Sequence, residues 1–150
     1  MIDGIKVYDL TKYEDERGWL METWRTDEHG FQAVMSYVSQ TNPGTARGPH
    51  EHVHQADYFI FMGPGRFKLY LWDNRKDSLT NSQKMELEAG EGEPKAVYVP
   101  AGVVHGYKCI SKGPGWCINL PDKLYKGEGK KEEVDEVRWE DKEDSPYKIS

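Results

Sequence analysis

The chain is poor in the features that mark secreted, membrane-bound and nucleic-acid-binding proteins. It has only two cysteines, Cys109 and Cys117, in 150 residues, too few for the disulfide framework of a small secreted domain. No apolar run approaches the roughly 20 residues of a membrane span, and the amino terminus lacks the pattern of a secretory signal. Acidic residues outnumber basic ones, and the net charge of −6 argues against a nucleic-acid surface. We therefore expect a cytoplasmic protein with reduced thiols and without nucleic-acid or membrane partners.

Aromatic residues, by contrast, are abundant and favour strands over helical bundles. Tyr, Trp and Phe make up 12% of the chain, and the β-compatible runs are short and separated by Gly, Pro, Asn and Asp. The run 66–72 alternates as a strand with one core face should. This pattern predicts a single all-β domain, a sandwich or barrel of the jelly-roll type. The expected strands are 5–8, 19–24, 31–40, 55–62, 66–72, 85–87, 96–99, 106–110 and 116–120.

The composition changes near residue 126. From there to residue 150 charged residues dominate. Trp139 and Tyr147 are the only aromatic residues of this segment. We expect a barrel domain over 1–125 and a charged carboxy-terminal segment over 126–150 that packs on the barrel or extends from it. The charged residues from Lys130 to Glu136 could form one short helix, but a solvated, partly ordered tail is the simpler expectation, and Trp139 is the residue that would anchor it.

Four of the five histidines fall in two motifs, His50-x-His52-x-His54-x-x-Asp57 and Pro-x-Gly-x-x-His105. Alternate side chains of a strand share a face, so His50 and His52 are expected to converge. His54 has the opposite parity from Asp57 and is expected to face outward or to lie behind the ligands. With His105 and the Asp57 carboxylate they form a ligand set for one divalent metal: zinc, iron, nickel or manganese. The same residues also suit a pocket without a cofactor.

A Gly-Pro-Gly turn follows the run that carries His105, and we expect it to close a hairpin. That hairpin places Cys109 opposite Cys117 and Tyr107 opposite Asn119. The pocket that His105 enters would then have Asn119, and also Cys117, in its wall.

Three motifs occur in a fixed order along most of the chain. They are Asp-Glu-Arg17-Gly-Trp-Leu-Met-Glu22, then Gln40-Thr-Asn42 with Arg47-Gly-Pro-His50, and Pro-Ala-Gly-Val-Val-His105-Gly-Tyr107. In this order the chain resembles the dTDP-4-dehydrorhamnose 3,5-epimerases and related sugar-nucleotide cupins. The resemblance implies a homodimeric cupin jelly-roll barrel that binds a nucleoside-diphosphate sugar. Guanidinium groups match phosphate oxygens even in an acidic protein. The residues that it places near the nucleotide are Arg17, Glu22, Gln40, Asn42 and Arg47.

The expected active site departs from the family pattern. In the family, the imidazole at His50 removes a proton beside the sugar's 4-keto group, and a lysine and the imidazole at His105 stabilise the enolate. Here Asp57 occupies the lysine position and Asn119 that of the acid tyrosine, although Tyr125 is retained. An amide cannot replace a phenol as proton donor. The family's aspartate that orients the base has no match. The resemblance therefore gives His50, His105, Asn119 and Tyr125 as the catalytic positions.

Three functions remain open from the sequence. The first is an epimerase or ketoisomerase acting on a nucleoside-diphosphate 4-keto-6-deoxy sugar, with His50 as base or metal ligand. The second is a metal-dependent cupin isomerase or dioxygenase for a small molecule that is not a nucleotide. The third is a sugar-binding cupin without catalysis.

Overall fold

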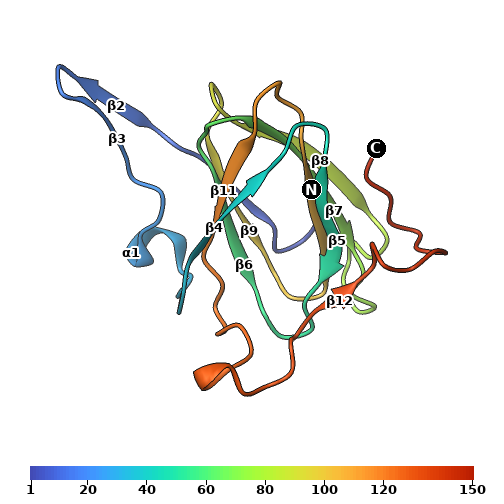
Figure 1. Cartoon of the computed structure of the whole chain (residues 1–150). Coiled ribbons are helices and arrows are strands. Elements are labelled where there is room, and N and C mark those ends of the chain that lie inside the picture. The colour runs from blue at the N-terminus through green and yellow to red at the C-terminus, as the bar shows by residue number, and fades with distance from the viewer.

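The computed structural model describes residues 1–150 and confirms the all-β prediction. Two five-stranded antiparallel sheets face each other, with strand orders β1-β9-β6-β11-β4 and β12-β5-β10-β7-β8 (Figure 1). None of the helical segments is long and apolar enough to span a membrane. The elements are β1 (Lys6–Asp9), β2 (Lys12–Asp15), β3 (Gly18–Met21), α1 (Thr26–His29), β4 (Tyr37–Thr41), β5 (Ala46–Glu51), β6 (Asp57–Phe61), β7 (Arg66–Asp73), β8 (Lys84–Gly90), β9 (Lys95–Val99), β10 (Val103–Cys109), β11 (Gly115–Asn119), the 3-10 turn η1 (Glu128–Lys130) and β12 (Val137–Arg138).

The main core lies between the two sheets. Phe67, Leu69 and Leu71 alternate along β7 and point into it, where they meet Phe59 and Phe61 of the opposite sheet. Burial of each such side chain contributes about 1.5–3 kcal/mol relative to exposure. The alternation of apolar residues that predicted this strand therefore also predicted which of its side chains face the core.

The second face of β7 is buried as well, which the sequence did not predict. Tyr70 and Trp72 are 0% and 8% exposed and form a smaller apolar cluster with Val104. Trp139 and Tyr147 of the carboxy-terminal segment pack against this cluster, and β12 pairs with β5. The segment thus forms contacts along the barrel and has no helix beyond the turn η1.

The prediction of a hairpin between β10 and β11 is wrong. β10 pairs with β5 and β7, whereas β11 pairs with β4 and β6, so the connecting loop crosses from one sheet to the other. A turn signal specifies a reversal of the chain but not the partner strand. Cys109 and Cys117 are therefore not a cross-strand pair; both are buried, free thiols. The strand expected over 31–40 is also shorter, because only β4 at its end is extended.

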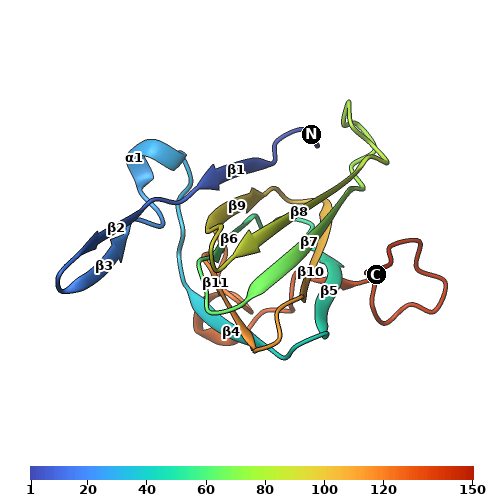
Figure 2. The same cartoon turned by 90° about the horizontal axis from the view of Figure 1, so that it is seen from above.

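The hairpin of β2 and β3 projects away from the barrel and pairs with no other strand (Figures 1 and 2). Three large side chains on it are exposed: Tyr13 at 59%, Trp19 at 53% and Leu20 at 62%. An apolar surface of this kind on a projecting arm is typical of a contact with another chain.

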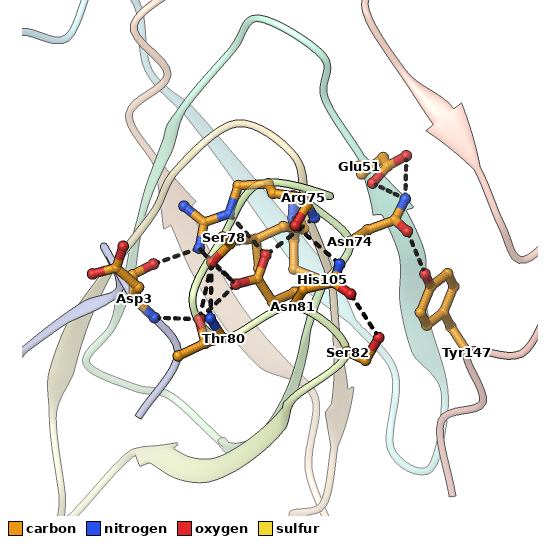
Figure 3. A network of polar contacts seen from close by, with 12 residues as sticks. Asp3, Glu51, Asn74, Arg75, Ser78, Thr80, Asn81, Ser82, His105 and Tyr147 are labelled. Atoms are coloured by element: carbon orange, nitrogen blue, oxygen red, sulfur yellow. Dashed lines mark hydrogen bonds and ion pairs between the residues drawn. The ribbon is translucent and has the colours of Figure 1, made fainter.

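Asp73, at the end of β7, is the centre of a polar network that fixes the following loop to the amino terminus (Figure 3). Its carboxylate accepts hydrogen bonds from Arg75 Nε and Nη2, both at 2.8 Å, from Ser78 Oγ at 2.5 Å and from Thr80 Oγ1 at 2.6 Å. Arg75 also donates to the backbone oxygen of Asp3 at 2.6 Å. The run Asp73-Asn-Arg75-Lys-Asp-Ser78, which begins at the last residue of β7, therefore builds a structural network.

Candidate active site

A cavity of about 1110 Å³ opens at the mouth of the barrel. Its walls come from both sheets: Tyr37 lies on β4 of one sheet, and Arg47, His50 and β10's Tyr107 belong to the other. Residues 121–140 of the carboxy-terminal region form much of the rim. A cavity of this size holds a ligand as large as a nucleotide sugar.

Three imidazoles cluster beside this cavity, and His50 and His52 line it. The ring centroids of His50 and His105 are 4.6 Å apart, and those of His52 lie 5.6 and 5.7 Å from them. His50 and His105 are direct partners in the β5–β10 register. Gly48 permits the close approach, since its φ is +79° and an added Cβ would lie 2.7 Å from the backbone oxygen of His105. His54 is exposed and also lines the cavity.

Asp57 joins the imidazoles to the opposite sheet. It starts β6, is 1% exposed, and its Oδ2 lies 3.2 Å from His52 Nε2 and 3.5 Å from His105 Nε2. Its Oδ1 accepts hydrogen bonds from Asn119 Nδ2 at 2.8 Å and from Gln55 Nε2 at 2.9 Å. Asn119 therefore does stand beside the pocket of His105, although it reaches this position from the facing sheet and not from a hairpin partner.

Two of the imidazoles have their tautomer fixed by the backbone. His105 Nδ1 donates to the oxygen of Val103 at 2.9 Å, and His52 Nδ1 donates to the oxygen of Asp135. The lone pair of each neutral ring is then at Nε2, and both Nε2 atoms face the carboxylate of Asp57. His105 Nε2 is buried and has no hydrogen-bond partner. Such a group of acceptors requires a cation between them, either a proton or a metal ion.

The electrostatics divide the histidines into different roles. Burial, together with the neighbouring imidazoles, lowers the pKa of His50 to about 2, so this ring is neutral with a free lone pair at neutral pH. Burial alone would lower the pKa of His52, but its hydrogen bond to Asp57 and the carboxylate charge raise it to about 9. Burial would raise the pKa of Asp57, yet His52 and His105 bring it down to about 2. In the absence of metal, His52 therefore carries the cationic proton.

Glu140 is a site residue that the sequence did not indicate. Its Oε1 lies 4.0 Å from Nδ1 of His50, and burial raises the pKa of Glu140. Arg138 of β12 pairs with His50 in the sheet, which brings the following residues over this imidazole. A carboxylate here is placed to orient the His50 ring, the role for which the sequence offered no residue.

The expected nucleotide residues form two separate groups. Gln40, Asn42 and Arg47 line one shallow cavity of about 250 Å³, and Arg47 lines the large cavity too. Arg47 Nη2 donates to the backbone oxygen of Gln40 at 2.7 Å. Arg17 and Glu22 instead lie on or beside the projecting hairpin, where Arg17 pairs with an aspartate next to it. Within one chain the structure does not bring these two residues to Arg47.

Tyr125, expected to be catalytic, lies at the rim of the large cavity and is 52% exposed. Its backbone nitrogen donates to Met35 Sδ at 3.3 Å, and its hydroxyl has no hydrogen bond to the histidine cluster or to Asp57. Tyr37 is connected to Asp57 through Asn119, because its hydroxyl accepts a hydrogen bond from Asn119 Nδ2 at 2.9 Å. No pattern in the sequence indicated Tyr37.

A double-sheet antiparallel barrel with clustered histidines and a buried carboxylate at its mouth defines a cupin-type protein. The fold agrees with that of the dTDP sugar isomerase from Desulfovibrio desulfuricans, which matches with a TM-score of 0.80 at 20% identity over 91% of this chain and 84% of that one.

The sequence comparisons are more specific. A probable low-salt glycan biosynthesis epimerase of Haloferax volcanii is 36% identical over 88% of this chain and 86% of its own length. A spore coat polysaccharide biosynthesis protein of Bacillus subtilis is 32% identical over 94% and 92%. The family model described as dTDP-4-dehydrorhamnose 3,5-epimerase matches residues 1–144, and the chain therefore belongs to this family. The resemblance inferred from the motifs is confirmed, and the chain is an enzyme of the isomerase class.

Proposed function

We propose that this protein is an epimerase or ketoisomerase of a nucleoside-diphosphate 4-keto-6-deoxy sugar. The single observation that carries the proposal is the neutral imidazole of His50 in the wall of a cavity large enough for the sugar nucleotide. The epimerase family and the 36% identical relative support the same reaction class. The two other functions, a cupin enzyme for a small molecule without a nucleotide and a sugar-binding cupin, account for this combination less well.

The base in this reaction is His50. It removes the proton from a carbon beside the 4-keto group: the C–H bond breaks, the proton passes to the imidazole, and the electron pair moves to the keto oxygen to give an enolate. Glu140 holds the ring and stabilises the imidazolium that forms, because its Oε1 already lies 4.0 Å from Nδ1. Return of a proton to the opposite face of the carbon then inverts its configuration.

The enolate needs a cation near Asp57, whose negative charge would otherwise repel it. We propose that His52, Asp57 and His105 hold one divalent metal, because both imidazoles are fixed through Nδ1 and direct Nε2 toward the carboxylate. The donor nitrogens of all three histidines lie within 4.8 Å of one another, but Nδ1 of His50 faces Glu140 instead of a backbone oxygen. When bound, the metal polarises the keto oxygen as a Lewis acid.

Metal content is measurable independently of activity. We expect chelated protein reconstituted separately with zinc, iron, nickel and manganese to bind one ion per chain, and Asp57→Ala to lose it, as read by elemental analysis. Chelated protein with full turnover and no bound metal would show that the proton on His52 supplies the positive charge instead.

The proposed assembly is a homodimer that forms through the β2–β3 hairpin. Its exposed Trp19 and Leu20 need a covering surface, and Arg17 lies on the same arm, far from the residues that it would join at a nucleotide. Light scattering after gel filtration is expected to give twice the chain mass for the wild type and the chain mass for Trp19→Ala/Leu20→Ala. A monomeric wild type would refute the dimer. A cytoplasmic location stays a prediction.

The reaction itself is tested by NMR of the product. Incubation of thymidine-, uridine- and guanosine-diphosphate 4-keto-6-deoxyglucose with the protein is expected to give an epimer at C3 or C5, or a shifted keto group, with one nucleotide preferred. Tight binding of these compounds without any product would favour the non-catalytic sugar-binding protein. If none of these compounds binds, the result would favour a cupin enzyme whose substrate has no nucleotide.

A further inference from the structure

Asn119 occupies the position where the family carries its acid tyrosine, and its cross-strand partner is itself a tyrosine. In the β4–β11 register Tyr37 stands directly opposite Asn119, and the Tyr37 hydroxyl lies 2.9 Å from Asn119 Nδ2. Side chains of such a pair share one face of a sheet. A phenol therefore reaches the same part of the barrel mouth from the neighbouring strand.

The hydrogen-bond directions leave the Tyr37 proton free. Asp57 is ionised and only accepts, so the amide of Asn119 must turn its NH₂ group toward Asp57 Oδ1, at 2.8 Å. The same NH₂ group uses its second hydrogen for the Tyr37 oxygen. Tyr37 is thus the acceptor in this hydrogen bond, and its own O–H remains available to a molecule in the cavity that it lines.

Tyr37 and His50 approach that cavity from opposite sides. Tyr37 belongs to β4 in one sheet and His50 to β5 in the facing sheet (Figure 1). The polar groups between them form a continuous row across the barrel, from the Tyr37 hydroxyl through Asn119 and Asp57 to His52. Inversion at a carbon requires a base on one face and an acid on the other, which is how these two residues are placed.

Tyr37 is 44% exposed and lines the cavity, and it is protonated, as an acid must be. Loss of solvent, more than any nearby charge, raises the pKa of Tyr37 to about 12, so the phenol keeps its proton at neutral pH. The other candidate phenols are less suitable. Tyr107 shares its hydroxyl with Ser39 at 3.1 Å, and the Tyr125 hydroxyl, unlike that of Tyr37, is not hydrogen-bonded to Asn119 or Asp57.

We propose that Tyr37 is the proton donor of the epimerisation, which rests on the function proposed above. Once His50 has taken the proton from one face, the enolate electron pair forms a new C–H bond on the other face with the proton of Tyr37. The O–H bond of Tyr37 breaks, the ketone re-forms, and a phenolate remains. Water then returns a proton to the phenolate and takes one from the His50 imidazolium.

The test separates proton removal from inversion in the same sample. The keto-sugar nucleotide that the wild type converts is incubated in D₂O with Tyr37→Phe, and NMR follows both deuterium at the carbon beside the ketone and its configuration. Tyr37→Phe is expected to retain deuterium exchange, because His50 can return deuterium to the face from which it took the proton. Inversion is expected to fall by about 100-fold or more, the typical range for a general acid. Tyr98→Phe, which changes a tyrosine outside the cavity, is the matched control.

Each other outcome overturns the inference. Parallel loss of exchange and inversion in Tyr37→Phe, with an unchanged melting temperature, would mean that Tyr37 only positions Asn119. Undiminished inversion would mean that another phenol is the acid, and Tyr107→Phe and Tyr125→Phe would identify it. A wild type that neither exchanges nor inverts any keto-sugar nucleotide would overturn the proposed function itself, a result distinct from a failure of the variant alone.

Discussion

Two buried aspartates lie at strand ends in facing sheets, Asp57 at the start of β6 and Asp73 at the end of β7, and they differ in the completeness of their surroundings. Every partner of Asp73 is a hydrogen-bond donor that belongs to its own loop: a guanidinium, two hydroxyls and a backbone amide. Asp57 instead has donors on Oδ1 only, and its Oδ2 faces imidazole nitrogens. Both carboxylate oxygens of Asp73 are thus satisfied by donors of one loop, whereas Oδ2 of Asp57 still faces imidazole nitrogens that need a cation.

The difference separates stability from chemistry. A buried group whose partners are all satisfied lowers the free energy of the folded state and gives a ligand nothing to bind. The lone pair of His105 Nε2 is buried without a hydrogen-bond partner, which destabilises the folded state. Folding alone gives no reason for such an atom. An unsatisfied polar group beside a large cavity is therefore the better indicator of function, and both aspartates have a lowered pKa that does not distinguish them.

The largest effect is expected at Asp57. Asp57→Asn keeps the shape and the hydrogen bonds of the side chain but removes the charge, so no cation is held between the imidazoles. We expect kcat to fall by about 1,000-fold, in the range lost with an electrostatic stabiliser. The loss of stability should be smaller than in Asp73→Ala, because His52 can release its proton and accept a hydrogen bond from the new amide. Steady-state kinetics and urea titration measure the two quantities. A stable variant with near-normal kcat would show that the network of Asp57 has no catalytic role.

The reverse behaviour is expected at Asp73. Asp73→Ala leaves Arg75 and two hydroxyls without their acceptor, and we expect it to lower the free energy of unfolding by about 3 kcal/mol. Turnover per folded molecule should be unchanged, because the loop after β7 contributes no residue to the cavity. Urea titration monitored by tryptophan fluorescence gives the stability. Equal loss of stability in Asp57→Asn and Asp73→Ala would remove the contrast between the two networks.

A smaller effect is expected for the nucleotide-binding arginines. Arg47→Ala and Arg17→Ala should each weaken binding of a nucleoside diphosphate by at least ~1.5 kcal/mol, the lower end for a charged hydrogen bond. Arg66→Ala, which removes an exposed arginine paired with Glu88, is the control for loss of charge. Calorimetric titration measures the affinity. Unchanged affinity in both Arg47→Ala and Arg17→Ala would argue against a nucleotide ligand.

The smallest effect concerns acid stability. Burial would raise the pKa of Asp73, but hydrogen bonds from Arg75, Ser78 and Thr80 hold it well below its ordinary range. A lowered pKa in the folded state gives stability above the unfolded value of about 3.9, and this stability is lost as the pH falls below it. The stability gap between wild type and Asp73→Asn should therefore narrow below about pH 4. A gap that stays constant from pH 7 to pH 3 would contradict the assignment.

Local patterns predicted those parts of the molecule that depend on local geometry. Strand parity placed His50 and His52 on one face, and alternation identified β7. Partner strands distant in sequence were not predictable: the turn after β10 is compatible with a hairpin and with a crossover, and the crossover is what forms. Tyr37 and Glu140 were not predicted as site residues for the same reason, because their positions depend on pairings that join strands about 80 to 90 residues apart.

The central claim is that His50 is the base of a proton-transfer reaction, and deuterium exchange tests it most directly. The keto-sugar nucleotide that the wild type converts is incubated in D₂O with wild type, His50→Gln and His29→Gln, the last changing a histidine outside the cavity. Mass spectrometry is expected to show incorporation of deuterium beside the ketone with wild type and His29→Gln. With folded His50→Gln it should be slower by about 100- to 10,000-fold, the usual contribution of a general base. Exchange at the wild-type rate in His50→Gln would contradict the account.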